Sequence, residues 1–238
     1  TGNCFFMNVA IFGGTFDPVH RGHLAVARAA QQAFKLGRIY FVPADIPPHK
    51  QRQPVTPLYH RYAMLALAMK GEPRFVPSLI EAPGPLSSNS GRKGGAPEVR
   101  RAPSYSIDTV RKFRALLPKR DRLFFIIGID AFLDIATWRK PEELLREVEF
   151  IVVSRPGFSM AEAGSRLQAL SFKNTPALAK TGLGRSTRNI PQVHLLEDVA
   201  EKASSTKVRA AASGRAAKGL LDEAVVEYIR KEHLYVRK

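Results

Sequence analysis

Two glycines and two histidines near the N-terminus have residue types and a spacing that could do chemistry. Gly13-Gly14 follows a short apolar run, and His20 and His23 lie three residues apart soon afterwards. Glycines let the backbone approach a ligand closely, and residues three apart share one side of a helix. Both imidazoles could therefore donate hydrogen bonds to one polyphosphate, and the pattern indicates a phosphate-binding site.

The same histidines have two simpler interpretations. They could be ordinary surface residues, or they could be a pair of metal ligands. A metal pair usually takes the spacing i, i+4 on a helix and needs a third ligand, and the sequence shows no obvious third. The glycines and the start of a helix beside them favour phosphate.

A strand and a helix must position these residues. The apolar run Val9 to Phe12 predicts a strand that is covered on both faces of a parallel sheet. Asp17-Pro18 is a turn signal. After His20 the apolar residues recur at helical spacing, at Leu24, Ala27, Ala30 and Phe34. The start of that helix presents free N–H groups and a positive dipole end, which attract an anion.

A second stretch, residues 204–209, has the same physical character. It reads Ser204-Ser205-Thr206-Lys207-Val208-Arg209 and precedes a helical pattern. Hydroxyls, free N–H groups and two cations at one helix start predict a second phosphate cradle. The alternative is a well-capped basic helix without a ligand.

These motifs resemble those of a known family. Gly13-Gly14-Thr15-Phe16-Asp17-Pro18 with the two histidines is similar to the signature of the nucleotidylyltransferase superfamily, in the form found in bacterial nicotinate-nucleotide adenylyltransferases. Four later stretches resemble further motifs of that family in the same order: Pro47-Pro48-His49-Lys50, Ser104-Tyr105-Ser106, Gly128 to Trp138, and residues 204–209. Ser106 stands where the family has Thr, and Val208 where it has Ile; both are conservative departures.

The resemblance implies adenylyl transfer from ATP to nicotinate mononucleotide, giving deamido-NAD and pyrophosphate in NAD biosynthesis. It implies Mg²⁺ carried by ATP and no metal site of the protein's own. The residues it implies to be catalytic are His20, His23, Lys50 and Arg209. Those implied to bind ATP are Gly13, Gly14, Thr15, Phe16, His20, His23, Gly128, Asp130, Ser205, Thr206 and Arg209. Those implied to bind nicotinate mononucleotide are Asp17, His49, Lys50, Tyr105, Ser106, Leu133 and Trp138.

Strand and helix patterns alternate along the whole chain. Further strands are predicted at Arg38–Val42, Phe75–Ser78, Arg122–Ile127, Phe150–Val153 and Val193–Leu196. Further helices are predicted at Leu58–Met69, after Ser106 as N-cap, from Pro141, and around Leu221–Ile229. The alternation predicts an α/β fold, a Rossmann-like doubly wound parallel sheet with helices on both faces. We expect a single domain over 1–238, flexible insertions at 84–102 and 158–191, and an extension at residues 1–6.

Composition limits the partners and the compartment. The net charge of +16 attracts anions such as nucleotides or nucleic acid. The single cysteine, Cys4, cannot form an intrachain disulfide, so we expect a reducing, cytoplasmic compartment. No apolar run is long enough for a membrane span, and the absence of a basic residue before Arg21 argues against a signal peptide.

Three other functions fit part of the pattern. A sister enzyme could adenylylate phosphopantetheine or transfer a nucleotide to another phosphate ester, but those families lack the Pro-Pro-His-Lys loop followed by Gly-x-Asp and Trp. A class I aminoacyl-tRNA synthetase fragment would share a motif of the His-x-Gly-His kind. The 238 residues of this chain, however, leave no room for an anticodon domain. A nucleic-acid-binding protein would explain the charge without explaining two phosphate cradles, so we expect ATP and nicotinate mononucleotide as partners and no obligatory nucleic acid. Oligomeric state does not follow from the sequence.

Overall fold

A computed structural model describes residues 6–47, 54–83, 103–154, 177–179, 192–197, 199, 209 and 219–236. Within these residues the strands form one seven-stranded sheet in the order β3-β2-β1-β4-β5-β7-β6. Every pair of neighbours is parallel. The strands are β1 (Asn8–Gly14), β2 (Arg38–Pro43), β3 (Phe75–Pro77), β4 (Arg122–Gly128), β5 (Glu149–Val153), β6 (Ala177–Ala179) and β7 (Gln192–Leu196).

The strand order reverses direction between β1 and β4. From β1 the chain first moves outward through β2 to β3, and then returns to β1's other edge to build β4, β5 and β7. In open parallel sheets a ligand crevice forms at such a reversal, outside the carboxyl ends of the strands. The prediction of a doubly wound parallel sheet is confirmed, and the sheet places Gly13-Gly14 at this reversal.

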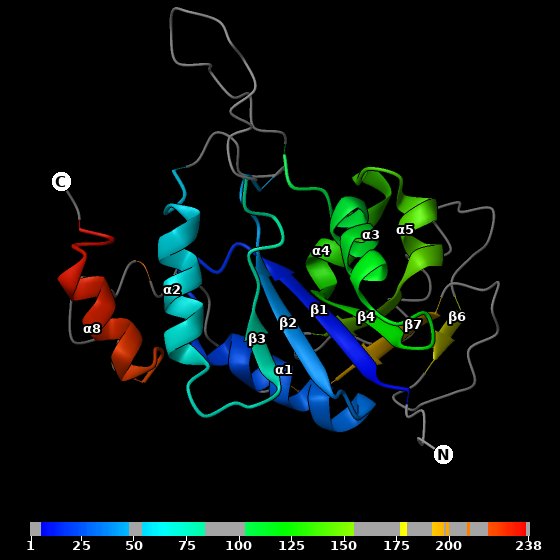
Figure 1. The fold of residues 1–238 in the computed structure, drawn as a ribbon, viewed down its shortest axis with the longest axis horizontal. Coiled ribbons are helices and arrows are strands. Elements are labelled where there is room, and N and C mark those ends of the chain that lie inside the picture. The colour runs from blue at the N-terminus through cyan, green and yellow to red at the C-terminus, as the bar shows by residue number, and fades with distance from the viewer. Residues whose placement is uncertain are drawn as a thin grey trace, which may run out of the picture.

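Helices cover both faces of the sheet (Figure 1). The helices are α1 (Arg21–Phe34), α2 (Leu58–Ala68), α3 (Ser106–Leu116), α4 (Ile129–Leu133), η2 (Ile135–Thr137), α5 (Pro141–Glu147) and α8 (Glu223–Lys231). One buried core joins α1, α2 and α8 to one face, and a second joins α3, α4, η2 and α5 to the other. Because successive side chains of β1 alternate between the two cores, Ala10 and Phe12 lie in the first and Val9 and Ile11 in the second.

Two expectations about local structure need correction. Strand β6 lies inside 158–191, where we expected only a flexible insertion, and it pairs with β7 through Ala177, Leu178 and Ala179. Three residues in an unpatterned region carry too little periodicity to predict a strand. The other residues of that segment, and all of 84–102, lie outside the described ranges.

The second correction concerns the start of α3. Its N-cap is Tyr105, in an extended conformation without a side-chain cap, whereas Ser106 is already the first helical residue. The hydroxyl of Ser104, the residue before this N-cap, accepts hydrogen bonds from the loop after β2. The expected order of elements is otherwise observed, including the strand and helix on either side of the glycines.

Candidate active site

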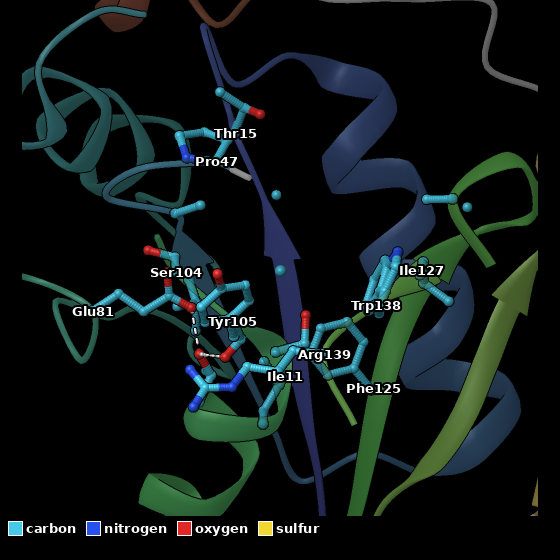
Figure 2. A pocket seen from close by; sticks show the side chains of 18 of the residues that line it. Ile11, Thr15, Pro47, Glu81, Ser104, Tyr105, Phe125, Ile127, Trp138 and Arg139 are labelled. Carbon is cyan, nitrogen blue, oxygen red and sulfur yellow. Dashed lines mark hydrogen bonds between the residues drawn. The ribbon is translucent and has the colours of Figure 1, made fainter. Parts of the chain in front are cut away.

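A cavity of about 300 Å³ opens at the carboxyl ends of β1, β2 and β4 (Figure 2). Predicted site residues from three separate motifs meet there: Gly13, Gly14, Thr15, Tyr105, Ser106, Gly128 and Trp138. Residues that the sequence analysis did not assign to the site also line it, including Glu81, Ser104, Thr109, Phe125, Ala131 and Arg139. The sheet reversal therefore brings together residues from more than half of the chain, between Ile11 and Arg139.

Aromatic rings lie close beneath the two glycines. A Cβ added to Gly13 would lie 2.9 Å from Cζ of Phe125, and one added to Gly14 would lie 3.1 Å from the ring of Phe16. Phe125 lines the cavity, so a side chain at Gly13 would displace part of the cavity wall. An aromatic ring of the protein lies nearest to each glycine, and the close approach of a ligand stays a prediction.

The histidine pair lies at the N-terminus of α1. His20 is the N-cap, and its backbone N–H donates to Nδ1 of His23 at 3.2 Å. The two rings stack with their centroids 3.7 Å apart. Because Nδ1 of His23 accepts a hydrogen bond, its proton belongs on Nε2, which is thereby free to donate to a ligand.

Burial keeps both imidazoles neutral. Burial lowers the pKa of His20 to about 4. The pKa of His23 is also well below its usual value, first because of burial and then because of His20 beside it. Nδ1 of His20 is itself buried and has no hydrogen-bond partner among the described residues. A polyphosphate at this helix start would meet N–H donors.

Phe16 supports this pair from the core side. It is buried, adopts a positive φ of 48°, and packs its ring 4.9 Å from that of His23. Its ring packs against the core aromatics Phe12 and Phe41 and lies beneath Gly14, but Phe16 does not itself line the cavity. Its assignment to ATP binding stays a prediction.

The far wall of the cavity is the start of α3. Oγ of Ser104 accepts hydrogen bonds from the N–H groups of Asp45 at 3.0 Å and Ile46 at 3.4 Å, which fixes α3 against the loop after β2. Glu81, after β3, accepts a hydrogen bond from the hydroxyl of Thr109 (Figure 2). Burial raises the pKa of Glu81.

Trp138 and Arg139 complete the pocket on the side of β4. Trp138 is half-buried and packs against the second core. The guanidinium of Arg139 lies 4.8 Å from the centre of the Tyr105 ring and 3.6 Å from the carboxylate of Asp108. The structure thus adds a cation to the cavity wall that the sequence analysis missed. Its position directly after Trp138 was the available signal.

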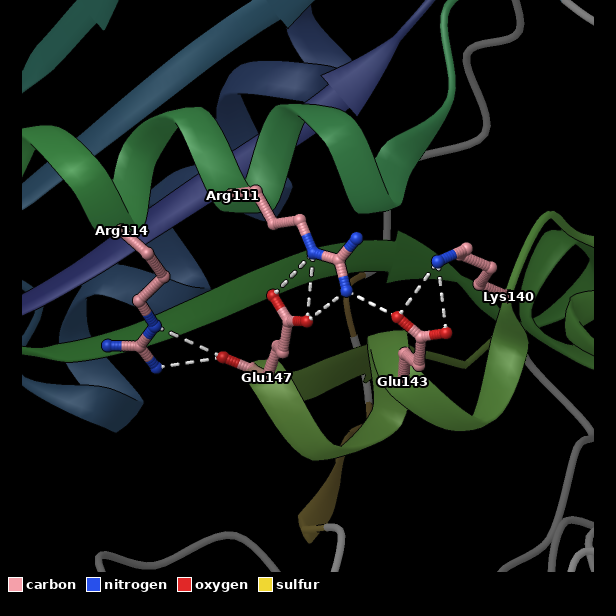
Figure 3. Close-up of polar contacts among 5 residues, drawn as sticks. All are labelled: Arg111, Arg114, Lys140, Glu143 and Glu147. Atoms are coloured by element: carbon pink, nitrogen blue, oxygen red, sulfur yellow. Dashed lines mark hydrogen bonds and ion pairs between the residues drawn. The ribbon is translucent and has the colours of Figure 1, made fainter.

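A network of ion pairs holds α3 against α5 behind this wall (Figure 3). Arg111 of α3 binds the carboxylates of Glu143 and Glu147, the latter at 2.7 Å. Arg114, one turn further on, donates to the carbonyl of Glu147 at 2.9 Å. Lys140, which precedes α5, contacts Glu143 at 3.1 Å. These contacts fix the segment after Trp138 relative to α3.

Asp17 and Arg209 join the two predicted phosphate motifs. Nη1 of Arg209 donates to the backbone carbonyl of Asp17 at 2.6 Å, across 192 residues. The carboxylate of Asp17 accepts from the N–H of Thr56 and from the hydroxyl of Tyr235. Asp17 is 5% exposed and is not among the residues that line the cavity, so its predicted role in binding the mononucleotide stays a prediction.

The remaining predicted residues are spread more widely. Asp130 is exposed on α4, and Leu133 packs against the second core; neither lines the cavity, where α4 contributes Ala131 instead. Four predicted residues, His49, Lys50, Ser205 and Thr206, lie outside the described ranges.

Arg61 is a buried cation that the sequence analysis missed. It is 1% exposed and donates to the carbonyls of Thr56 at 2.7 Å, Thr15 at 2.9 Å and Asp45 at 3.4 Å. Arg61 therefore ties the loops after β1 and β2 to the start of α2. Its place three residues from the buried Met64 on the helix was a signal of burial.

The described residues contain no group of three or more His, Cys, Asp or Glu side chains that could hold a metal ion. No helix among them is both long and apolar enough to cross a membrane.

The parallel sheet, the cavity at its reversal and the histidine pair at a helix start define a Rossmann-like nucleotidylyltransferase. The sequence profile of the cytidylyltransferase-like family matches residues 11–211. Relatives named "probable nicotinate-nucleotide adenylyltransferase" include one from Moorella thermoacetica, 40% identical over 95% of this chain and 91% of its own length. Another, from Symbiobacterium thermophilum, is 40% identical over 96% of this chain and 95% of its own. The chain belongs to the nicotinate-nucleotide adenylyltransferase family.

A solved structure has the same fold. The nicotinic acid mononucleotide adenylyltransferase of Plasmodium falciparum, complexed with NaAD, superposes with a TM-score of 0.66 over 96% of this chain and 97% of that one. The two sequences are 19% identical, so the likeness concerns the fold alone.

Proposed function

We propose that this chain transfers the adenylyl group of ATP to nicotinate mononucleotide, giving deamido-NAD and pyrophosphate, as a step of NAD biosynthesis. The observation that carries the proposal is one cavity with two unlike walls. One wall is the glycine turn that leads to the histidine pair, and the other is the start of α3 with Trp138. The first suits a polyphosphate, and the second suits an anionic aromatic ring.

The reaction needs no nucleophile from the protein. An oxygen of the mononucleotide phosphate attacks the α-phosphorus of ATP, a new P–O bond forms, and the bond to pyrophosphate breaks in line. Positioning of the two substrates and stabilisation of the phosphate charge then supply the catalysis. Neutral His20 and His23 act as hydrogen-bond donors, since burial lowers both pKa values. Lys50, Ser205, Thr206 and Arg209 complete the phosphate contacts in this proposal.

Mg²⁺ arrives with ATP in this proposal. Mg²⁺ commonly keeps several waters and binds through substrate phosphates. Substrate oxygens and water would then be its main ligands. When bound, the ion neutralises charge on the triphosphate.

The pyridine wall favours a carboxylate over an amide. The N-terminus of α3 offers the hydroxyl and N–H of Ser106 and a positive dipole end. Arg139 adds a formal positive charge to the same cavity. The NH₂ of an amide would meet these donors with another donor and leave buried groups unpaired. Trp138 supplies an aromatic surface for the ring.

A side-by-side assay tests this proposal. Pyrophosphate release from ATP is measured with nicotinate mononucleotide, its amide and phosphopantetheine. We expect kcat/KM for the acid to exceed that for the amide by roughly tenfold to a thousandfold, from a penalty of about 1–3 kcal/mol for each unpaired group. Phosphopantetheine should give no turnover. Equal rates on acid and amide would remove Ser106 and its helix from carboxylate recognition but leave nucleotidyl transfer in place.

The single cysteine also leads us to propose a cytoplasmic location for this activity.

A further inference from the structure

The end of the described chain reaches back to the first phosphate motif. Tyr235 lies just after α8, and its hydroxyl donates to Oδ1 of Asp17 at 2.6 Å, although 218 residues separate the two. The ring of Tyr235 packs against the first core, and its backbone takes the left-handed conformation, with φ at 61°. A bulky side chain rarely adopts that conformation without surrounding contacts that hold it.

Asp17 is the point where three segments converge. Its carboxylate accepts from Tyr235 and, at 3.3 Å, from the N–H of Thr56, while its backbone carbonyl accepts from Arg209 at 2.6 Å. It lies three residues before His20, within the loop that leads from Gly14 into α1. The backbone carbonyl of Asp17 therefore anchors the guanidinium of Arg209 to the loop that leads to the histidine pair.

A buried carboxylate is held firmly only when its oxygens are hydrogen-bonded. The phenol of Tyr235 stays protonated, because burial and then the hydrogen bond to Asp17 raise its pKa. It can thus donate to Asp17 throughout the neutral range. The N–H of Thr56 donates to the other carboxylate oxygen, Oδ2, over a longer distance, while Oδ1 accepts from Tyr235.

We infer that Tyr235 is a positioning residue of the nucleotide site, which acts through Asp17 to hold Arg209 beside the histidine pair. The effect of Tyr235 on catalysis rests on the proposed function. Its effect on ATP binding does not, because that measurement needs no second substrate. Tyr235 itself need not touch either substrate.

The chain offers a matched control in Tyr228. It lies on α8, one face of which packs toward α2, and its hydroxyl is 2.8 Å from Nδ1 of His60. Tyr228→Phe and Tyr235→Phe each remove one partly buried hydroxyl and keep the ring. Only Tyr235→Phe removes a contact to the phosphate motif. A general loss of packing would affect both variants, whereas loss of that contact would affect Tyr235→Phe alone.

The first measurement is the affinity for a non-hydrolysable ATP analogue, by calorimetry, with melting temperatures recorded for every variant. Tyr235→Phe should weaken binding about tenfold, the scale of one lost hydrogen bond to a charged group. Tyr228→Phe should bind within about twofold of the wild type at a similar melting temperature. Wild-type affinity in Tyr235→Phe, or an equal loss in both variants, would overturn the inference.

A second measurement separates action through Arg209 from a purely structural role. In an Arg209→Ala background, Tyr235→Phe should cause little further loss of analogue affinity, because its route to the nucleotide is already removed. A full additional loss would show that Tyr235 acts elsewhere and would overturn the inference. If the wild type binds the analogue but releases no pyrophosphate with nicotinate mononucleotide, the proposed function fails while the binding comparison still decides the role of Tyr235.

Discussion

At the scale of single residues, the stacked histidines explain how a neutral pair can serve an anion. Nδ1 of His23 is occupied by the N–H of His20, which leaves Nε2 as its donor. Arg209 approaches the same loop through the carbonyl of Asp17. Donor hydrogen bonds and one fixed cation suit a transition state in which negative charge spreads over phosphate oxygens.

We expect His23→Ala and Arg209→Ala each to lower kcat/KM by roughly a hundredfold or more, since losing one transition-state donor costs about 2.7–4 kcal/mol. Steady-state pyrophosphate release measures the effect, and circular dichroism checks that each variant folds. Near-normal turnover in either variant would exclude that residue from the mechanism.

The pKa of His20 makes a prediction about stability. Burial holds it at about 4, below the value of about 6.5 for an unfolded chain. Between these values the unfolded state binds more protons, so stability is lost as the pH falls through this window. We expect His20→Asn to flatten the fall in the free energy of unfolding between about pH 6.5 and about pH 4.5.

Urea unfolding at several pH values measures this slope. His233→Asn is the matched control, because His233 is exposed and Asn tolerates its positive φ of 50°. The control should keep the wild-type slope, and an unchanged slope in His20→Asn would contradict the assignment.

At the scale of elements, the site depends on loops that a single buried arginine holds together. Arg61 of α2 donates to carbonyls in the loops after β1 and β2 and before α2 itself. Carbonyls inside a folded chain are costly when they lose their donors. The exposed Arg111, by contrast, joins α3 to α5 at the surface, where water can replace it.

We therefore predict that Arg61→Leu lowers the free energy of unfolding by at least about 3 kcal/mol, the sum of three unsatisfied acceptors at about 1 kcal/mol each. Arg111→Leu, the same change at an exposed ion pair, should have a much smaller effect. Urea denaturation midpoints compare the two variants, and equal losses would show that Arg61 is not the tie between these loops.

At the scale of the whole molecule, the charge of +16 must be separated from the reaction. A basic surface binds nucleic acid through counterion release, which weakens steeply as salt rises. Contacts inside a cavity are screened less than exposed charges. Charge alone would account for weak binding to DNA, but it does not account for a cavity at the sheet reversal.

We expect adenylyl transfer to persist at salt concentrations that abolish DNA binding. Fluorescence anisotropy with a short DNA duplex and pyrophosphate release, measured over the same salt series, test this directly. A requirement for added DNA or RNA, or a tight sequence-specific complex, would contradict the small-molecule function.

The sequence by itself determined the features that depend on neighbours along the chain. The apolar run, the two glycines and the stripe from Leu24 to Phe34 predicted β1, its turn and α1, and these are observed. Alternating elements predicted the parallel sheet, which is observed. Local periodicity and turn chemistry are sufficient for such features.

Only the tertiary structure decided which distant groups meet. Nothing in the residues around Tyr235 predicts its contact with Asp17, and nothing around Arg61 specifies the three carbonyls that it binds. Strand β6 forms because β7 offers an edge, and Tyr105 becomes the cap of α3 while the hydroxyl of Ser104 binds the loop after β2. Each of these contacts depends on how separate elements pack, and no local pattern in the chain carries that information.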